Sequence, residues 1–260
     1  MRVLAIGDIV GRPGRRILAS RLPALRKELD VDFIVANAEN AAGGVGITAD
    51  IGQELLALGI DLLTMGNHAW GKREAYEFLD NEPRIIRPAN YPDGAPGRGW
   101  TVVRSRSGVP VGVGNLGGRV FFLSGLDCPF RTALTMVEEM GKTAKVILVD
   151  FHAEATSEKV AMGHHLDGRV SAVFGTHTHV QTADARVLPG GTAYITDLGM
   201  TGPVDSVIGI KKDIVIERFL TQLPSRFEVA TGPAMLCGAL FDIDESCGRA
   251  LSTRAVCVSE

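Results

Sequence analysis

The sequence has few aromatic residues, no long apolar run and no excess of positive charge. Aromatic side chains make up 6% of the 260 residues, and hydrophobic residues make up 45%. No apolar run reaches the ~18 residues of a membrane-spanning helix, and the apolar share is too high for a disordered chain. Glycine, with 31 residues, shows no Gly-X-Y repeat, which excludes a collagen-like chain. We therefore expect a soluble globular protein, and the length fits one domain over residues 1–260.

The charges exclude several kinds of partner. Lys and Arg total 27 against 30 Asp and Glu, a net charge of −3, which argues against broad electrostatic binding to duplex nucleic acid. The first residues, MRVLAIGDIVG, form a short apolar stretch that Asp8 interrupts. This pattern predicts a first strand and not a secretory signal. We expect a cytoplasmic protein that binds neither membranes nor duplex nucleic acid.

The four cysteines do not form a C-x-x-C pair. Three of them lie close together near the C-terminus. The spacing favours buried, reduced thiols over disulfides or a zinc site. The cysteines concerned are Cys128, Cys237, Cys247 and Cys257.

Apolar runs and helix-period segments alternate in much of the chain. Continuous β-rich runs are typical of strands that are buried on both faces. Helical segments lie between several of them, and the alternation predicts a parallel α/β sheet. The segment from Thr48 to Gly59 begins with a capping threonine and ends in glycine. The expected strands are 3–6, 33–36, 62–65, 146–151, 172–174 and 193–196, and the other expected helices are 72–79, 132–140 and 156–166.

Two parts of the chain carry strands without helices between them, which predicts antiparallel pairs. They make the architecture mixed, with α/β units first and strands at the end. These strands are expected at 100–106, 109–114, 119–124, 227–230, 236–242 and 250–258.

Polar side chains follow five of the apolar runs. Ligands of α/β sheets bind at the carboxyl ends of the strands, so these residues are candidates for a site. Four of the six histidines belong to this set. The five strand ends are Gly7-Asp8, Asn37–Asn40, Gly66-Asn67-His68, Phe151-His152 and Gly175–His179.

Each residue of this set also has an ordinary structural explanation. Asp8 can cap a helix or stabilise a turn, and a single histidine such as His152 is more often a hydrogen-bonded residue than a ligand. In a regular strand His177 and His179 point to the same face. A pair of metal ligands would have this arrangement, but so would two histidines placed there by chance. The convergence of five strand ends is the main evidence for a site.

The donor set indicates a metal centre. Histidine, aspartate, glutamate and asparagine without cysteine suit a divalent ion such as Mn, Fe or Zn. The donors are too many for one tetrahedral ion. They suffice for two ions ~3.5–4 Å apart that share a carboxylate, as in phosphatases and nucleases.

The order of these motifs resembles the calcineurin-like metallophosphoesterase superfamily. Three positions depart from the usual blocks of that superfamily. Val10 stands at a histidine position, Glu39 at the position of a bridging aspartate, and Thr176 between the last glycine and histidine. Asn40 can replace the missing histidine as a ligand.

These departures are similar to those of its YmdB-like branch. The segments GDIVGRPGR, NAENAAGGVGIT, MGNHAW, VDFHAEATSEK, GTHTHVQTAD and AYITDLGMTGP carry the resemblance, from residue 2 to about residue 233. The resemblance implies a four-layer α/β/β/α sandwich with mixed sheets and a homo-oligomer. It also implies a phosphodiesterase of cyclic nucleotides, with 2′,3′-cyclic nucleotides favoured.

The same resemblance implies two metal ions, with Fe or Mn favoured and Zn possible. Glu39 would bridge them, and the sequence does not identify substrate-binding residues. One ion would take Asp8, Glu39, Asn40 and His179, and the other Glu39, Asn67, His152 and His177.

The mechanistic hypothesis is in-line hydrolysis of a phosphodiester by a hydroxide that the two metals generate. His68 directly follows a ligand position, so it can lie near the site without binding metal. We assign it as the general acid for the leaving sugar oxygen, or as a donor to its developing charge.

Two other functions compete with this hypothesis. A dinucleotide-dependent oxidoreductase is suggested by Gly7, Gly11 and Gly14 after the first strand, but their spacing is not G-x-G-x-x-G. A non-catalytic nucleotide-binding regulator on the same scaffold is the second. Metal-dependent turnover separates the hypothesis from both.

Overall fold

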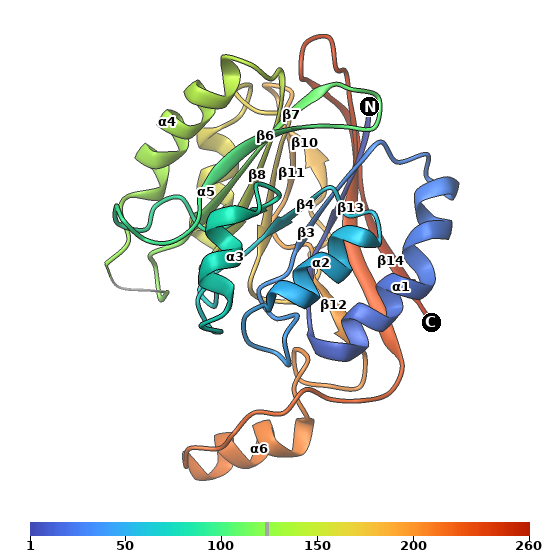
Figure 1. The fold of residues 1–260 in the computed structure, drawn as a ribbon, viewed down its shortest axis with the longest axis vertical. Helices are drawn as coiled ribbons and strands as arrows, with labels where there is room; N and C mark the ends of the chain where they lie inside the picture. Colours follow the sequence, from blue (N-terminus) through green and yellow to red (C-terminus); the bar gives the residue numbers. More distant parts are fainter. Residues whose placement is uncertain (123–124) are drawn as a thin grey trace.

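The structure is a computed structural model, and it describes residues 1–122 and 125–260. Two mixed β-sheets lie face to face, and helices cover the outer face of each (Figure 1). The prediction of a four-layer α/β/β/α sandwich is confirmed.

The first sheet has the strand order β2-β12-β13-β1-β3-β4-β5, and β14 pairs with β13. Strands β1, β3, β4 and β5 are parallel, whereas β13 runs antiparallel to β1, β12 and β14. Strands that are covered on both faces read as continuous apolar runs. The bounds are β1 Arg2–Ile6, β2 Asp8–Ile9, β3 Phe33–Asn37, β4 Leu62–Thr64, β5 Ile85–Ile86, β12 Met200–Pro203, β13 Ala234–Ile243 and β14 Ala250–Ser259.

The second sheet has the order β10-β11-β9-β8-β7-β6. Its four central strands are parallel, and the two outer strands are antiparallel to their neighbours. The bounds are β6 Trp100–Arg104, β7 Pro110–Gly117, β8 Val146–His152, β9 Ala172–Thr176, β10 Arg186–Val187 and β11 Ala193–Ile195.

Within residues 1–122 and 125–260, five helices form the two outer layers. Helices α1 (Gly11–Glu28), α2 (Ala49–Ala57) and α3 (Ala75–Asn81) pack on the first sheet, and α4 (Pro129–Gly141) and α5 (Thr156–His165) pack on the second. Apolar side chains of both sheets fill the layer between them. The predicted cap is present, because the Thr48 hydroxyl accepts the Ile51 N–H at 3.2 Å. In the described part of the chain no helix has the length and hydropathy that a membrane crossing requires.

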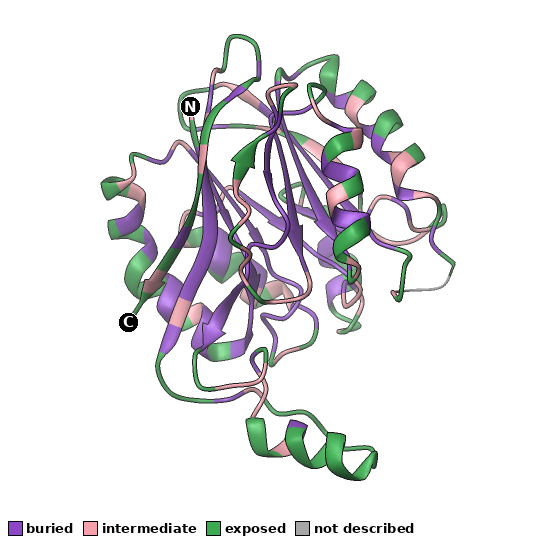
Figure 2. Ribbon diagram, turned by 180° about the vertical axis from the view of Figure 1, so that it is seen from behind, coloured by how far each residue is buried: buried purple, intermediate pink, exposed green. Residues whose placement is uncertain are grey.

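Helix α6 (Lys212–Thr221) lies outside the four layers (Figure 1). Val215 is its buried residue, and Figure 2 shows most of the helix exposed. Phe219 is 72% exposed and Leu220 80% exposed. We call residues 211–223 the α6 arm.

Two predicted strands are wrong. Residues 119–122 form a turn, and 123–124 lie outside the described residues. The backbone N–H groups of Arg119 and Val120 donate to the Glu158 carboxylate and so do not enter a strand ladder. In 227–230, only Val229 forms a bridge, to Ile210.

Helices α1 and α6 were not among the expected elements. Helix α1 begins at Gly11 and contains Pro13 and Pro23, residues that disfavour helices. Pro13 is tolerated in the first turn, where the backbone N–H groups have no helical partner. Tertiary packing of its apolar face on the first sheet outweighs these local preferences.

The expectation of four buried thiols is also wrong. Of the four cysteines, all within the described residues, Cys237 is buried and Cys128 is half-buried. Cys247 and Cys257 are exposed. Cys247 lies in the turn between β13 and β14, and Cys257 lies on β14, which among the described strands pairs only with β13.

Candidate metal centre

The candidate residues from the five strand ends meet at one edge of the two sheets. The first sheet brings four oxygen-bearing side chains, and the second brings three histidines. Because parallel strands end at the same edge, distant sequence motifs become neighbours. Asp8 lies at the start of β2, Glu39 and Asn40 follow β3, Asn67 and His68 follow β4, His152 ends β8, and His177 and His179 follow β9.

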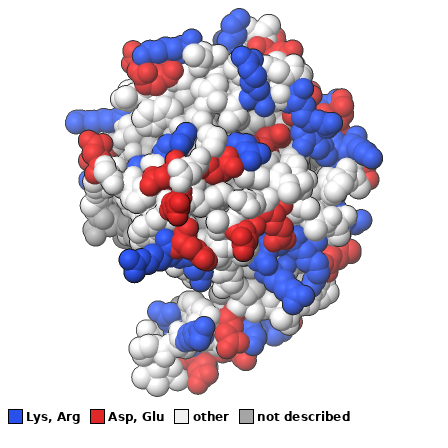
Figure 3. Space-filling view, viewed as in Figure 1, with Lys and Arg blue, Asp and Glu red and all other residues white. Residues whose placement is uncertain are grey.

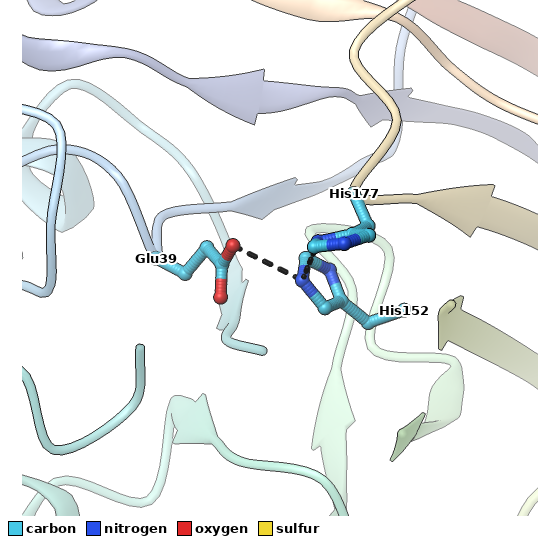
Figure 4. A group of neighbouring side chains, drawn as sticks. All are labelled: Glu39, His152 and His177. Carbon is cyan, nitrogen blue, oxygen red and sulfur yellow. Dashed lines mark hydrogen bonds and ion pairs between the residues drawn. The ribbon is translucent and has the colours of Figure 1, made fainter. Parts of the chain in front are cut away.

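One nitrogen of His152 lies at the centre of this group. Its Nε2 atom lies 3.0 Å from Glu39 Oε1 and 3.1 Å from Asn67 Oδ1. His177 Nδ1 lies 3.2 Å from the same atom. Figure 4 shows Glu39, His152 and His177 pointing toward one another. Ligand atoms about 2.1 Å from one ion are separated by similar distances, roughly 3–3.5 Å.

The outward ring nitrogen of each histidine has a partner in the protein. His152 Nδ1 lies 2.8 Å from Thr176 Oγ1, and His177 Nε2 lies 3.1 Å from Glu154 Oε2. His179 Nδ1 lies 2.9 Å from the Ile208 carbonyl. Metal-binding histidines are held in this way, with the outward N–H donated to an oxygen. The inward nitrogens then present lone pairs to the centre.

The centre therefore collects acceptors without a matching number of donors. The inward nitrogen of His152 faces the carboxylate oxygen of Glu39, and the inward nitrogen of His177 faces that of His152. Among the described residues, buried Asp8 Oδ1 has no hydrogen-bond partner, and it lies 3.6 Å from His179 Nε2. Buried lone pairs need a proton or a cation. The donor set fits divalent first-row ions.

The pKa values of the histidines show the demand for positive charge. Burial acts to lower the pKa of His179, but the Asp8 carboxylate outweighs it and raises that pKa to about 9. Burial is likewise outweighed at His152, whose pKa is raised by Glu39 and Asp8. Burial and the neighbouring His152 lower the pKa of His177 to about 3. The two carboxylates thus favour positive charge on His152 and His179.

The carboxylates stay ionised despite their burial. Burial acts to raise the pKa of Asp8, but the charges of His179 and His152 hold that pKa well below its usual range. Burial acts in the same way on Glu39, where His152 and His68 lower the pKa. Both groups are therefore available as anionic ligands.

His177 and His179 do not lie in a strand, contrary to the expectation. Strand β9 ends at Thr176, and both histidines have left-handed backbones, with φ of 94° and 65°. This strained loop is held by Thr178, whose N–H and hydroxyl both bond to Asp197 Oδ2. Lys159, itself buried, lies 2.7 Å from the same oxygen. Loss of one partner of such a buried pair costs about 3–5 kcal/mol.

Asn40 connects the two halves of the centre. Its Nδ2 lies 3.3 Å from Glu39 Oε1 and 3.2 Å from His179 Nε2. Its Oδ1 faces His68 Nδ1 at 3.1 Å. Ligation through Asn40 Oδ1 would therefore need a half-turn of the amide.

His68 lies at the border between the centre and solvent. Its side chain is 37% exposed, and Nδ1 lies 3.7 Å from Glu39 Oε1. Its backbone N–H donates to Glu39 Oε2 at 3.1 Å, so it positions that carboxylate whatever its side chain is. Its ring faces the pocket described next.

A pocket of about 310 Å³ opens beside the donors. One wall carries polar groups of the centre, and the other is apolar. The pocket was not foreseen, because part of its wall, Ile208, Ile210 and Phe227, comes from segments with no motif. The apolar wall includes Val10, Val45, Ile208, Ile210 and Phe227.

Gly66 shows how closely the segments approach. A Cβ atom at this position would lie 2.2 Å from His152 Nε2 and 2.3 Å from Glu39 Oε2. No other residue fits between β4 and the centre.

The sequence reasoning missed the residues that support the ligand candidates. Asp150 accepts a hydrogen bond of 2.6 Å from the Thr176 hydroxyl, which in turn accepts from His152. Burial raises the pKa of Asp150 to about 6. Asp150 could have been found from the sequence, because an acidic residue within the apolar run VILVDFH is unusual for a buried strand. Thr176 was noted only as a departure from the usual motif, and Glu154, Lys159 and Asp197 gave no signal.

Comparison with known proteins agrees with this geometry. The model of the family described as YmdB-like protein matches residues 4–256. The chain belongs to this family. The family expected from the sequence motifs is thus confirmed.

Known proteins that are similar to this chain match over its whole length. A protein of Bacillus subtilis (strain 168), named 2′,3′-cyclic-nucleotide 2′-phosphodiesterase, is 48% identical over 260 residues, which is 100% of this chain and 98% of that protein. A hypothetical protein from Thermus thermophilus has a solved structure with a TM-score of 0.93 and 42% identity, with full coverage of both chains. A phosphatase structure from Mycoplasma pneumoniae has a TM-score of 0.94 and 33% identity over 100% of this chain and 94% of that chain.

Proposed function

We propose that this chain is a metal-dependent phosphodiesterase that hydrolyses cyclic nucleotides, with 2′,3′-cyclic nucleotides favoured. The observation that carries the proposal is the group of lone pairs from Glu39, Asn67, His152 and His177 around one point. The name of the Bacillus subtilis relative supports the choice of substrate.

The residues of the centre divide into two ligand sets that share Glu39. Divalent ions held there would bind phosphate oxygens and lower the pKa of water. Fe, Mn and Zn all suit donors of nitrogen and oxygen without cysteine, and the resemblance to the family favours Fe or Mn. The proposed sets are Asp8, Glu39, Asn40 and His179 for one ion, and Glu39, Asn67, His152 and His177 for the other.

His68 is the proposed general acid. Nδ1 of its ring faces the Asn40 amide, which leaves Nε2 to give a proton to the leaving sugar oxygen. A general acid at this position is typically worth about 10²–10⁴ in rate. His68 is not among the proposed ligands.

The apolar wall of the pocket suits a nucleobase. Phe227 lines it together with Val45 and Ile208. Aromatic and apolar surfaces bind bases by stacking and with little preference among them. A phosphodiester next to the donors would place its base against this wall, which supports a nucleotide over a small phosphate ester.

We also propose that the protein is a homo-oligomer. The α6 arm exposes Ile216, Phe219, Leu220 and Leu223 by 52–80%. Exposed apolar groups of this kind mark contact sites between proteins. On the face drawn in Figure 3, Lys and Arg are interspersed with Asp and Glu, so this face has no broad positive surface for duplex nucleic acid.

Two expectations from the sequence remain predictions. They are a cytoplasmic location and one domain over residues 1–260. The two-sheet architecture differs from the single doubly-wound sheet of dinucleotide-binding domains, so the oxidoreductase alternative is not part of the proposal.

The test is a reloading assay. Protein stripped of metal and reloaded with Mn²⁺, Fe²⁺ or Zn²⁺ is given 2′,3′- and 3′,5′-cyclic nucleotides and an aryl phosphodiester. We expect metal-dependent hydrolysis, fastest with 2′,3′-cyclic nucleotides. Binding of cyclic nucleotides without turnover would favour the regulator, and no turnover with any metal would refute the enzyme.

A further inference from the structure

Two cysteines lie opposite each other on neighbouring strands at the edge of the first sheet. Cys237 on β13 is paired with Cys257 on β14, and their sulfur atoms are 3.5 Å apart. Cys237 is buried, whereas Cys257 is exposed. The pair lies outside the metal donors, and nothing in the proposed reaction uses it.

The backbone places this pair at a position that suits a disulfide. The Cys237 carbonyl accepts the Gly7 N–H at 2.9 Å, so the peptide groups of Cys237 point to β1 and away from β14. Cys237 and Cys257 therefore form a non-hydrogen-bonded pair, in which Cα atoms are about 4.5 Å apart. Disulfides need a Cα separation of about 4.4–6.8 Å.

Neighbouring contacts hold the two strands in place without help from the sulfur atoms. The Gln181 amide donates to the Gly238 carbonyl at 2.8 Å and to the Val256 carbonyl at 3.0 Å. Each carbonyl is adjacent in sequence to one of the cysteines. Rotation of the two side chains can therefore bring the sulfur atoms together while the backbone stays fixed.

We propose that Cys237 and Cys257 are a reversible oxidation site, at which a peroxide converts the two thiols to a disulfide. The Cys257 sulfur attacks the peroxide first, because it is exposed; an S–O bond forms, the O–O bond breaks and one water leaves. The Cys237 sulfur then attacks the Cys257 sulfur, the S–O bond breaks and a second water leaves. Two electrons pass from the thiols to the peroxide.

The different environments of the thiols fit this order. Burial and the neighbouring Cys257 raise the pKa of the Cys237 thiol, so Cys237 is protonated and out of reach of the oxidant in the first step. In the second step its proton passes to the oxygen that leaves Cys257 as water. A dithiol reductant restores both thiols by exchange at the exposed sulfur.

The pair is also close to the candidate metal centre through backbone contacts. The carbonyl that accepts the Gly7 N–H belongs to Cys237, and Gly7 precedes Asp8. Gln181 follows His179 by two residues. Because the disulfide closes without backbone movement, we expect it to stabilise this edge of the sheet and to leave metal content unchanged.

The test uses the full chain with Cys128→Ser and Cys247→Ser, which leaves only the two thiols of the pair. Hydrogen peroxide at low excess should remove the mass of two hydrogen atoms, abolish both reactive thiols after denaturation and raise the melting temperature. Dithiothreitol should reverse all three changes. A third substitution, Cys257→Ser at the exposed position, should leave the Cys237 thiol reduced under the same treatment.

Three results would overturn the proposal. They are oxygen added to Cys257 without loss of hydrogen, two thiols that stay reactive, or a disulfide between two chains on a non-reducing gel. None of these readouts depends on phosphodiesterase activity, so failure of the proposed function would leave the test valid.

Discussion

Polar side chains are buried at the ends of β3, β8 and β9, and apolar side chains are exposed on the α6 arm. Glu39 and His152 are 1% and 0% exposed, whereas Phe219 and Leu220 are 72% and 80% exposed. Both arrangements are unfavourable in free energy for the isolated chain. The buried charges of the centre lose hydration, and the exposed apolar groups of the arm order water. We propose that both regions are completed by binding, the centre by cations and the arm by protein.

The largest effect is expected from Glu39→Gln, which removes the shared carboxylate. Substitution of residues that only support a ligand costs about 10–100-fold in affinity or activity, so loss of a shared ligand should exceed this range. Metal analysis after gel filtration should find less than the full metal content. A variant with full metal content and low activity would show that Glu39 is not a ligand.

The next effect is expected from His68→Ala. We expect kcat to fall about 10²–10⁴-fold, with metal content unchanged, because the backbone N–H that holds Glu39 is retained. The matched control is His164→Ala, at an exposed position in the last turn of α5. If metal content falls together with kcat, His68 is a ligand and not the acid.

Thr176→Val should have a smaller effect on the centre. The change keeps the shape of the side chain but removes the hydroxyl between His152 and Asp150. We expect metal affinity or activity to fall about 10–100-fold. Thr221→Val on the exposed arm is the control and should leave both unchanged. If the two variants have the same metal affinity and activity, the Thr176 hydroxyl does not position His152.

Substitutions on the α6 arm should change the oligomeric state and leave the metal centre unaffected. Replacement of Phe219 by Ser together with Leu220→Glu should reduce the molar mass measured by light scattering and leave activity per chain unchanged. The physical reason is that these side chains contribute apolar area and lie on a helix outside the four layers. An unchanged mass would remove the arm from the proposed interface.

The smallest effect concerns metal-free protein and pH. The pKa of His179 is raised to about 9 in the folded chain, above its ordinary value of about 6.5. The protonated His179 therefore stabilises the folded state. Its contribution to the free energy of unfolding is fully present below pH 6.5 and is lost as pH rises through about 9. The melting temperature of stripped protein should therefore fall over this window, by roughly 2–4 °C per kcal/mol. His179→Gln should flatten that part of the profile, and an unchanged slope would contradict the assignment.

Much of the fold could be predicted because the local pattern and the final structure agree. The runs at Val3, Phe33 and Val146 are strands in both, and the cap at Thr48 formed as expected. Helix α1 could not be predicted, since its prolines and glycines oppose a helix and its packing on the first sheet decides the outcome.

The sequence by itself determined which donors stand at the strand ends, because parallel strands of buried runs must end at one edge. It also determined the absence of a cysteine-based ligand set. The geometry of those donors depends on residues that are far apart in the chain. Thr176 orients His152, and the pair of Lys159 and Asp197 holds the loop with two left-handed histidines.

Tertiary structure alone decided the remaining features. Cys237 and Cys257 become partners through strand pairing, the pocket beside the centre forms where motif segments meet the distant residues Ile208, Ile210 and Phe227, and the α6 arm is exposed. The physical reason is the same in each case. A local pattern reports what a residue prefers, whereas burial, pairing and exposure depend on which distant segments pack against it.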